Sequence, residues 1–134
     1  MLKLSRRVEY GIMAVRHIAQ KQGASVCTAR EIAVAHNLPY DLVAKVLQRL
    51  TKSGIVMSQQ GVNGGYVLAR SASAISIHSI ITSIEGNDPA LMPCVDTAEM
   101  CEFERLCNIK SPLMKIQERI TDVFQRMTVA EISS

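Results

Sequence analysis

Three cysteines in the second half of the chain have the clearest capacity for chemistry. Cys94, Cys101 and Cys107 are spaced Cys-x6-Cys-x5-Cys within residues 89–110, a stretch with no clear helical or strand period. Soft thiolates select iron–sulfur clusters, zinc or copper(I). The spacing lacks the close Cys-x-x-Cys pair of structural zinc sites, and the stretch contains no histidine. An iron–sulfur cluster with one labile non-cysteine ligand fits a sensor, while zinc and reactive or inert thiols stay open alternatives.

The remaining cysteine and the histidines do not extend this pattern. Cys27 is far from the loop in sequence, at the entry to a predicted helix, and we expect a packed core thiol there. His17 and His78 are expected at the surface or partly packed. His36 ends a predicted helix, where a cation interacts well with the helix dipole. A ligand or redox-relay role for His36 is the weaker alternative.

A predicted helix over residues 41–52 has the composition of a DNA-reading element. Its polar face carries Lys45 and Arg49, four residues apart, with Gln48 beside them, so these side chains can meet base edges and phosphates together. Asp41 could accept a hydrogen bond from a cytosine amino group, but we favour helix capping for it. Thr28 and Arg30 open the preceding helix, whose free backbone N–H groups favour a phosphate.

A glycine-rich hairpin follows this helix. Residues 55–57 and 66–68 are β-prone and enclose Gly61-Val-Asn-Gly-Gly65. The glycines permit close backbone approach to DNA, and the expected contact residues of this wing are Asn63, Gly64, Gly65 and Tyr66. Three helices and a hairpin in this order predict a winged helix-turn-helix within residues 1–70.

Local signals define the elements that position these residues. Ser5 caps a first helix that Gly23 ends, and Thr28 with Glu31 forms a capping box for a second helix that stops at residues 37–39. Residues 71–134 are expected to contain a helix over 76–85, the cysteine loop over 89–110, a helix over 111–127 that Ser111 caps, and a short last turn after Thr128. The fold class is therefore mostly α, a winged helix-turn-helix with a small β-hairpin wing and a long C-terminal dimerisation helix.

The helix over residues 111–127 carries one apolar stripe along its length. A single chain offers little else to cover it, so we expect a homodimer. The stripe comprises Leu113, Ile116, Ile120, Val123, Phe124 and Met127.

Charge and composition narrow the function. Residues 1–70 hold ten Lys and Arg against three acids, whereas residues 71–134 hold five against nine, so a polyanion would be bound by the first part. There is no apolar run of membrane-spanning length and no signal-peptide pattern, which predicts a cytoplasmic protein without a membrane partner. No nucleophile–base pair, phosphate loop or carboxylate pair in a plausible site indicates an enzyme.

The chain resembles the IscR/NsrR-type family of regulators along essentially its whole length. The resemblance is carried by Lys3-Leu-Ser with Glu9-Tyr-Gly11, by Leu47-Gln-Arg-Leu-Thr-Lys-Ser-Gly-Ile-Val56, by Gly61-Val-Asn-Gly-Gly-Tyr-Val-Leu-Ala69, and by the cysteine loop followed by a long helix. It implies a homodimer that binds double-stranded palindromic promoter DNA and senses iron–sulfur status, redox state or nitric oxide. It also implies a [2Fe–2S] or [4Fe–4S] cluster on Cys94, Cys101 and Cys107.

The fourth cluster ligand differs among branches of that family. Where the best-known two-iron member has a histidine, this chain has Lys110, and the first gap between cysteines is one residue longer than usual. The nitric-oxide-sensing branch takes a carboxylate from near the partner's N-terminus, and Glu9 occupies the matching place. A redox-sensing branch adds a histidine where this chain has Met13.

The expected function is thus DNA binding controlled by an iron–sulfur cluster. One rival is a cluster-free winged-helix regulator that acts by thiol redox chemistry or through a protein partner. The other is an iron–sulfur electron-transfer or carrier protein, which would leave the basic first half of the chain unexplained.

Overall fold

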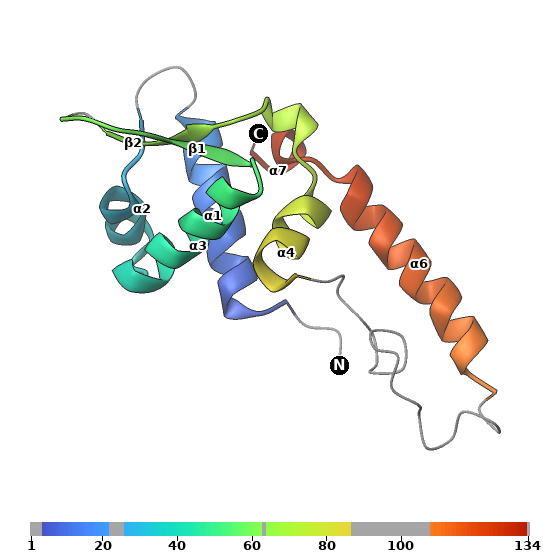
Figure 1. Cartoon of the computed structure of the whole chain (residues 1–134). Coiled ribbons are helices and arrows are strands. Elements are labelled where there is room, and N and C mark those ends of the chain that lie inside the picture. The colour runs from blue at the N-terminus through green and yellow to red at the C-terminus, as the bar shows by residue number, and fades with distance from the viewer. Residues whose placement is uncertain (1–3, 22–25, 63, 87–107, 134) are drawn as a thin grey trace.

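Helix α1, Arg6–Gln20, forms the centre of the fold (Figure 1). In the computed structural model, residues 4–21, 26–62, 64–86 and 108–133 are described. The side chain of Ser5 accepts a hydrogen bond from the Val8 N–H at 3.2 Å, so the predicted cap is confirmed. Gly23 does not end the helix, because the C-cap residue is already Lys21, whose N–H bonds to the Ile18 carbonyl.

Helices α2, Ala29–His36, and α3, Tyr40–Lys52, form the helix-turn-helix. Asn37 ends α2 in the left-handed conformation, at φ 53°, and the Leu38 N–H bonds back to the Ala33 carbonyl at 2.8 Å. The helix therefore stops within the expected residues 37–39, at an asparagine that tolerates this conformation and before Pro39 is reached. Pro39 instead precedes α3 as its N-cap.

The predicted wing is present as strands β1, Val56–Gln59, and β2, Gly65–Leu68. They pair antiparallel, with Val56 opposite Leu68 and Gln59 opposite Gly65. Cys27, just before α2, forms an isolated antiparallel bridge with Tyr66 of β2. The two residues exchange backbone hydrogen bonds of 3.0 and 2.7 Å. The base of the wing is thereby fixed to the start of α2.

Three further helices complete the described fold, after a short 3-10 turn, η1, over Ala72–Ala74. The predicted helix over residues 76–85 is present as α4, Ile77–Glu85; Ser76 is its N-cap rather than its first residue, and Gly86, at φ 83°, ends it. Helix α6, Lys110–Arg126, starts one residue before Ser111, and no side chain caps it. The expected capping by Ser111 is therefore wrong, since that serine already lies inside the helix. Helix α7, Val129–Ser133, follows Thr128, which caps it.

One apolar core joins these elements. Figure 1 shows α1 between two groups, with α2, α3 and the wing on one side and α4 and α6 on the other. The core takes side chains from both sides of residue 70, including Val15 and Leu47 from the first part and Ile80 and Val129 from the second. Two backbone hydrogen bonds hold α7 to η1 and α4. The Val129 N–H donates to the Ile75 carbonyl, and the Ile77 N–H donates to the Met127 carbonyl. Helices α3 and α4 thus share one rigid support.

Candidate functional site

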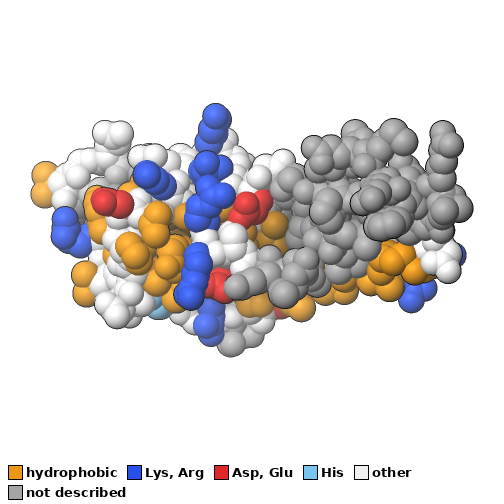
Figure 2. All heavy atoms as spheres, turned by 90° about the horizontal axis from the view of Figure 1, so that it is seen from below, with side chains coloured by type: hydrophobic (Ala, Val, Ile, Leu, Met, Phe, Trp, Pro, Cys, Tyr) orange, Lys and Arg blue, Asp and Glu red, His pale blue; other side chains and the backbone are white. Residues whose placement is uncertain are grey.

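The outer face of α3 is the part of the fold best suited to DNA. Lys45, Gln48 and Arg49 are exposed, while Val46 and Leu47 on the opposite face are buried in the core. Seen from below, Figure 2 shows a band of Lys and Arg side chains crossing this side of the molecule. The helix therefore presents cations outward from an anchored backbone, which is what contact with phosphates and guanine edges requires.

Asp41 and Arg49 have partners or positions that the sequence did not indicate. Asp41 lies inside the first turn of α3 and makes no cap, because Pro39 is the N-cap and no side chain accepts there. The capping role favoured for Asp41 is therefore wrong, although a carboxylate in the first turn still suits the helix dipole. Nη1 of Arg49 donates to the Ile84 carbonyl at 2.8 Å. One edge of this guanidinium is thus bound to the end of α4.

The start of α2 has the predicted side-chain cap. Oγ1 of Thr28 accepts a hydrogen bond from the Glu31 N–H at 3.0 Å, and Thr28 and Arg30 are both exposed. The guanidinium of Arg30 lies 5.1 Å from the centre of the Tyr40 ring, a cation–π contact that joins α2 to the start of α3. The reciprocal half of the capping box is absent among the described contacts, because the Glu31 carboxylate binds His17 and Lys21 instead.

The wing glycines serve the chain's own backbone. A Cβ on Gly64 would lie 2.6 Å from the Gln59 carbonyl oxygen, and one on Gly65 would lie 2.8 Å from the Cys27 carbonyl oxygen. Both positions need glycine to close the hairpin and the Cys27 bridge, whatever they do at DNA. Tyr66 packs against the core from its half-buried position. Asn63 lies outside the described residues.

The predicted cluster ligands are described only in part. Cys94, Cys101 and Cys107 lie outside the described residues. Glu9 is exposed on the first turns of α1 and lines an open hollow of about 290 Å³ with Leu4, Ser5 and Arg6. Among the described residues, the Glu9 side chain makes no hydrogen bond or ion pair, so its carboxylate is available as a ligand.

The end of α4 is tied to the start of α1 and to α3. Glu85 accepts a hydrogen bond from the Ser5 hydroxyl at the start of α1 and an ion pair from Arg7 at 3.5 Å. The Ser83 hydroxyl donates to the Arg49 carbonyl at 3.2 Å, alongside the Arg49 bond to Ile84. The end of α4 is therefore linked directly to α3 and to the start of α1.

The apolar stripe of α6 divides into two parts. Ile116 and Val123 are 47% and 57% exposed, and Leu113 and Ile120 are half-buried beside them. Phe124 and Met127, at the other end, pack against the core of their own chain. Figure 2 shows apolar side chains along the right-hand part of the molecule, where α6 lies in Figure 1. The exposed surface is thus shorter than the sequence predicted, with its C-terminal end used as an anchor.

One cluster of chemically capable side chains was missed by sequence reasoning. His17, Cys27 and Glu31 come from α1, the bridge before α2, and α2, and their ligand atoms lie within 4.8 Å of one another. The expectation of a core thiol at Cys27 is confirmed by its full burial, and His17 is partly packed as expected. The spacing of four between Cys27 and Glu31 was the available signal, but His17 joins them only through packing.

Burial and charge set the protonation of this cluster. Burial, and then the negative charge of Glu31, raises the pKa of the Cys27 thiol to about 11. The hydrogen bond from His17, with a further contribution from Lys21, lowers the pKa of the Glu31 carboxyl. Cys27 is therefore a neutral thiol at neutral pH and a poor candidate for the thiol-redox chemistry of a cluster-free regulator.

Among the described residues, no helix has the length and apolar character that a membrane crossing needs.

Comparison with known proteins agrees with the fold. The chain is 24% identical over 131 residues to the HTH-type transcriptional regulator IscR of Erwinia tasmaniensis, covering 98% of this chain and 78% of that protein. The structure superposes on CymR (YrzC), the global cysteine regulator of B. subtilis, with a TM-score of 0.82 at 26% identity, over 99% of this chain and 97% of that one. The T. potens IscR structure matches with a TM-score of 0.76 at 27% identity, over 98% and 85% of the two chains.

These relatives are transcription regulators rather than enzymes. The winged-helix fold predicted from the sequence is therefore confirmed. Residues 4–134 match the Rrf2 family, described as an iron-dependent transcriptional regulator, and the chain belongs to this family.

Proposed function

We propose that this protein is a cytoplasmic homodimer that binds palindromic promoter DNA with an affinity set by an iron–sulfur cluster. The carrying observation is the three-thiol loop, Cys94, Cys101 and Cys107, in a chain of an iron-dependent regulator family. Three soft thiolates with one harder oxygen ligand, Glu9 of the partner subunit, form a donor set suited to an iron–sulfur cluster with one labile iron. When bound, the cluster would supply sensitivity to oxidation and to ligand loss.

The DNA-binding part of the proposal rests on the two α3 helices of a dimer. Two-fold symmetry places them on half-sites separated by one helical turn of about 10–10.5 base pairs, or a multiple of it. Lys45 and Gln48 supply exposed polar groups on the outer face of α3, and Thr28 and Arg30 supply phosphate contacts at the start of α2. The wing would contact the neighbouring DNA backbone through Asn63, Gly64, Gly65 and Tyr66.

The proposed dimer forms through the exposed apolar part of α6. Leu113, Ile116, Ile120 and Val123 lie at helical spacing on one side of α6, and their exposure leaves them available to a second copy. The chain's own contacts support a path from loop to DNA, since Ser83 and Ile84 bind Arg49 of α3. The loop follows directly after α4, so its arrangement biases the position of α3.

A cluster-free regulator is the second candidate function. The close structural likeness to CymR, named as a cysteine regulator, favours it. In that case a protein partner or a small ligand would act on the same link between α4 and α3. The buried, neutral Cys27 makes thiol chemistry at that residue the less favoured version.

Iron content of single-cysteine variants separates the two candidates. Cys94→Ala, Cys101→Ala and Cys107→Ala should each remove most of the iron from anaerobically purified protein, whereas Cys27→Ala should retain it. Glu9→Ala should leave a more fragile cluster with an altered absorption spectrum. Equal iron in all four cysteine variants, or no iron in the parent protein, would leave the cluster-free regulator as the function.

A further inference from the structure

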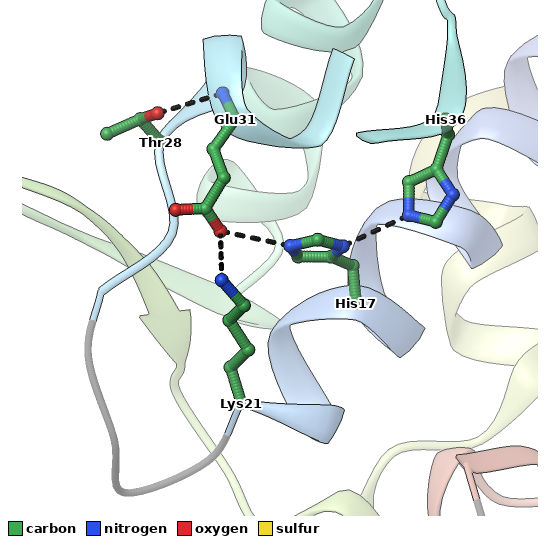
Figure 3. Close-up of polar contacts among 5 residues, drawn as sticks. All are labelled: His17, Lys21, Thr28, Glu31 and His36. Atoms are coloured by element: carbon green, nitrogen blue, oxygen red, sulfur yellow. Dashed lines mark hydrogen bonds and ion pairs between the residues drawn. The ribbon is translucent and has the colours of Figure 1, made fainter. Parts of the chain in front are cut away.

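The side-chain group of His17, Cys27 and Glu31 has the geometry of a metal-ion site, not only of a surface ion pair. Nε2 of His17 lies 3.0 Å from Oε2 of Glu31, and the Cys27 sulfur completes a set of three ligand atoms that all lie within 4.8 Å of one another. Figure 3 shows the His17 ring between Glu31 on one side and His36 on the other. Sulfur, imidazole nitrogen and carboxylate oxygen together are the donors that zinc and similar ions take.

The imidazole of His17 is oriented as a metal-ligating histidine usually is. Its Nδ1 lies 3.0 Å from Nε2 of His36, which leaves Nε2 for the ligand side. Ligating histidines commonly bind a second group through the other ring nitrogen, and this contact fixes the tautomer and the ring plane. The two rings pack edge to face, with their centroids 5.1 Å apart. His36 is thus a positioning residue for His17.

The three ligands differ in exposure in a way that gives the site a protected and an open side. Cys27 is fully buried, the His17 side chain is 12% exposed, and the Glu31 side chain is 34% exposed. The ammonium of Lys21 lies 3.1 Å from Oε2 of Glu31, and the Lys21 side chain is 45% exposed. A cation therefore already stands on the open side, on a long side chain that can withdraw to solvent.

We propose that His17, Cys27 and Glu31 form a binding site for a divalent transition ion of the zinc class. Three protein ligands leave the fourth position of a tetrahedron to water. When the ion binds, the Cys27 sulfur forms a bond to the metal and releases its proton to solvent, and Lys21 leaves Glu31. No change in oxidation state is involved. The site is separate from the loop cysteines and does not rest on the iron–sulfur proposal.

Such an ion would join three separate parts of the fold. His17 belongs to α1, Glu31 to α2, and the backbone of Cys27 is hydrogen-bonded to Tyr66 at the base of the wing. The Glu31 N–H also holds the Thr28 cap at the start of α2. Occupancy would therefore fix α2 and the wing relative to α1.

The test uses the full-length chain with Cys94, Cys101 and Cys107 changed to Ser, so that loop thiolates cannot contribute. Chelator-treated protein is titrated with Co²⁺ and then with Zn²⁺, and folding is checked by circular dichroism. We expect one Co²⁺ per chain, a thiolate-to-cobalt charge-transfer band, the strong visible bands of four-coordinate cobalt, and loss of all of them on adding Zn²⁺. The same titration of the parent protein and its Cys27→Ser variant, compared by difference, covers a loop variant that fails to fold.

Single variants at the ligands then separate a site from a simple ion-pair network. His36→Gln should weaken Co²⁺ binding by about 10–100-fold, the usual effect of losing a group that orients a ligand. His17→Gln and Glu31→Gln should weaken it more, and His78→Gln, a histidine on α4, should leave it unchanged. Absence of the charge-transfer band in folded protein, or Co²⁺ affinity unaffected by His17→Gln and Glu31→Gln, would overturn the proposal.

Discussion

Lys45 and Arg49 carry the same charge on the same face of α3, yet their surroundings give them different roles. Lys45 is exposed, with no contact described for its ammonium, so its full charge is available to a phosphate or a base. Arg49 shares its guanidinium between the solvent-facing side and the Ile84 carbonyl of α4. We expect Lys45 to act only on DNA and Arg49 to act on both DNA and the fold.

Lys45→Ala should weaken operator binding without changing stability. Removing one phosphate contact reduces the slope of log affinity against log salt by about 0.9. A base contact instead costs about 1–3 kcal/mol and relaxes the sequence preference at one position. Fluorescence anisotropy on operator and scrambled fragments over a range of salt distinguishes these outcomes. Unchanged binding at every salt concentration would contradict the assignment of α3 as the recognition helix.

Arg49→Ala should lower the stability of the protein as well as its DNA affinity. The bond to the Ile84 carbonyl has a charged donor, and such a hydrogen bond contributes about 1.5–3 kcal/mol. The change in unfolding free energy can be measured by urea denaturation, with Lys45→Ala as the matched control on the same helix. Equal stability of the two variants would show that the link between α3 and α4 is energetically neutral.

Helix starts were the most predictable features at the scale of elements. Ser5, Thr28, Ser76 and Thr128 each stand where a serine or threonine precedes an apolar period, and each caps a helix. These signals are local, so the chain sequence carries them completely. The cap predicted at Ser111 was wrong because α6 starts one residue earlier in the chain, at Lys110, and no local signal marks that start.

Contacts between elements were less predictable, for a physical reason. Glu31 looked like half of a capping box, but its carboxylate bonds to the His17 ring at 3.0 Å and to the Lys21 ammonium at 3.1 Å instead. Gly64 and Gly65 looked like DNA contacts, and the structure shows that the hairpin and the Cys27 bridge themselves require them. In both cases the deciding partner is remote in sequence.

Thr28→Ala should destabilise the start of α2 by about 1 kcal/mol, the usual effect of losing a side-chain N-cap. Thr28 accepts from the Glu31 N–H, so its loss leaves that donor without its cap. Thr28→Ser keeps the hydroxyl and should retain nearly all of the stability. Denaturant unfolding of the two variants is the measurement, and a Thr28→Ala protein as stable as Thr28→Ser would show that water replaces the cap without cost.

At the scale of the whole molecule, the proposed dimer depends on the exposed part of α6. Val123→Asp or Ile116→Asp should convert the dimer to a monomer, because a buried unpaired carboxylate is costly to desolvate. Gln125→Asp, an exposed polar position on the same helix, is the control and should leave the dimer intact. Sedimentation velocity over a range of concentrations reports the result. A parent protein that sediments as a folded monomer would contradict the dimer.

The most direct test of the central claim measures operator affinity and cluster content on the same preparation. Protein purified without oxygen should contain iron and sulfide in cluster stoichiometry. Removing the cluster should change operator affinity by about 5- to 150-fold, the usual range of coupling between two sites, while Cys101→Ala should behave as cluster-free protein throughout. Operator affinity that is identical before and after iron and sulfide are removed would contradict control by a cluster.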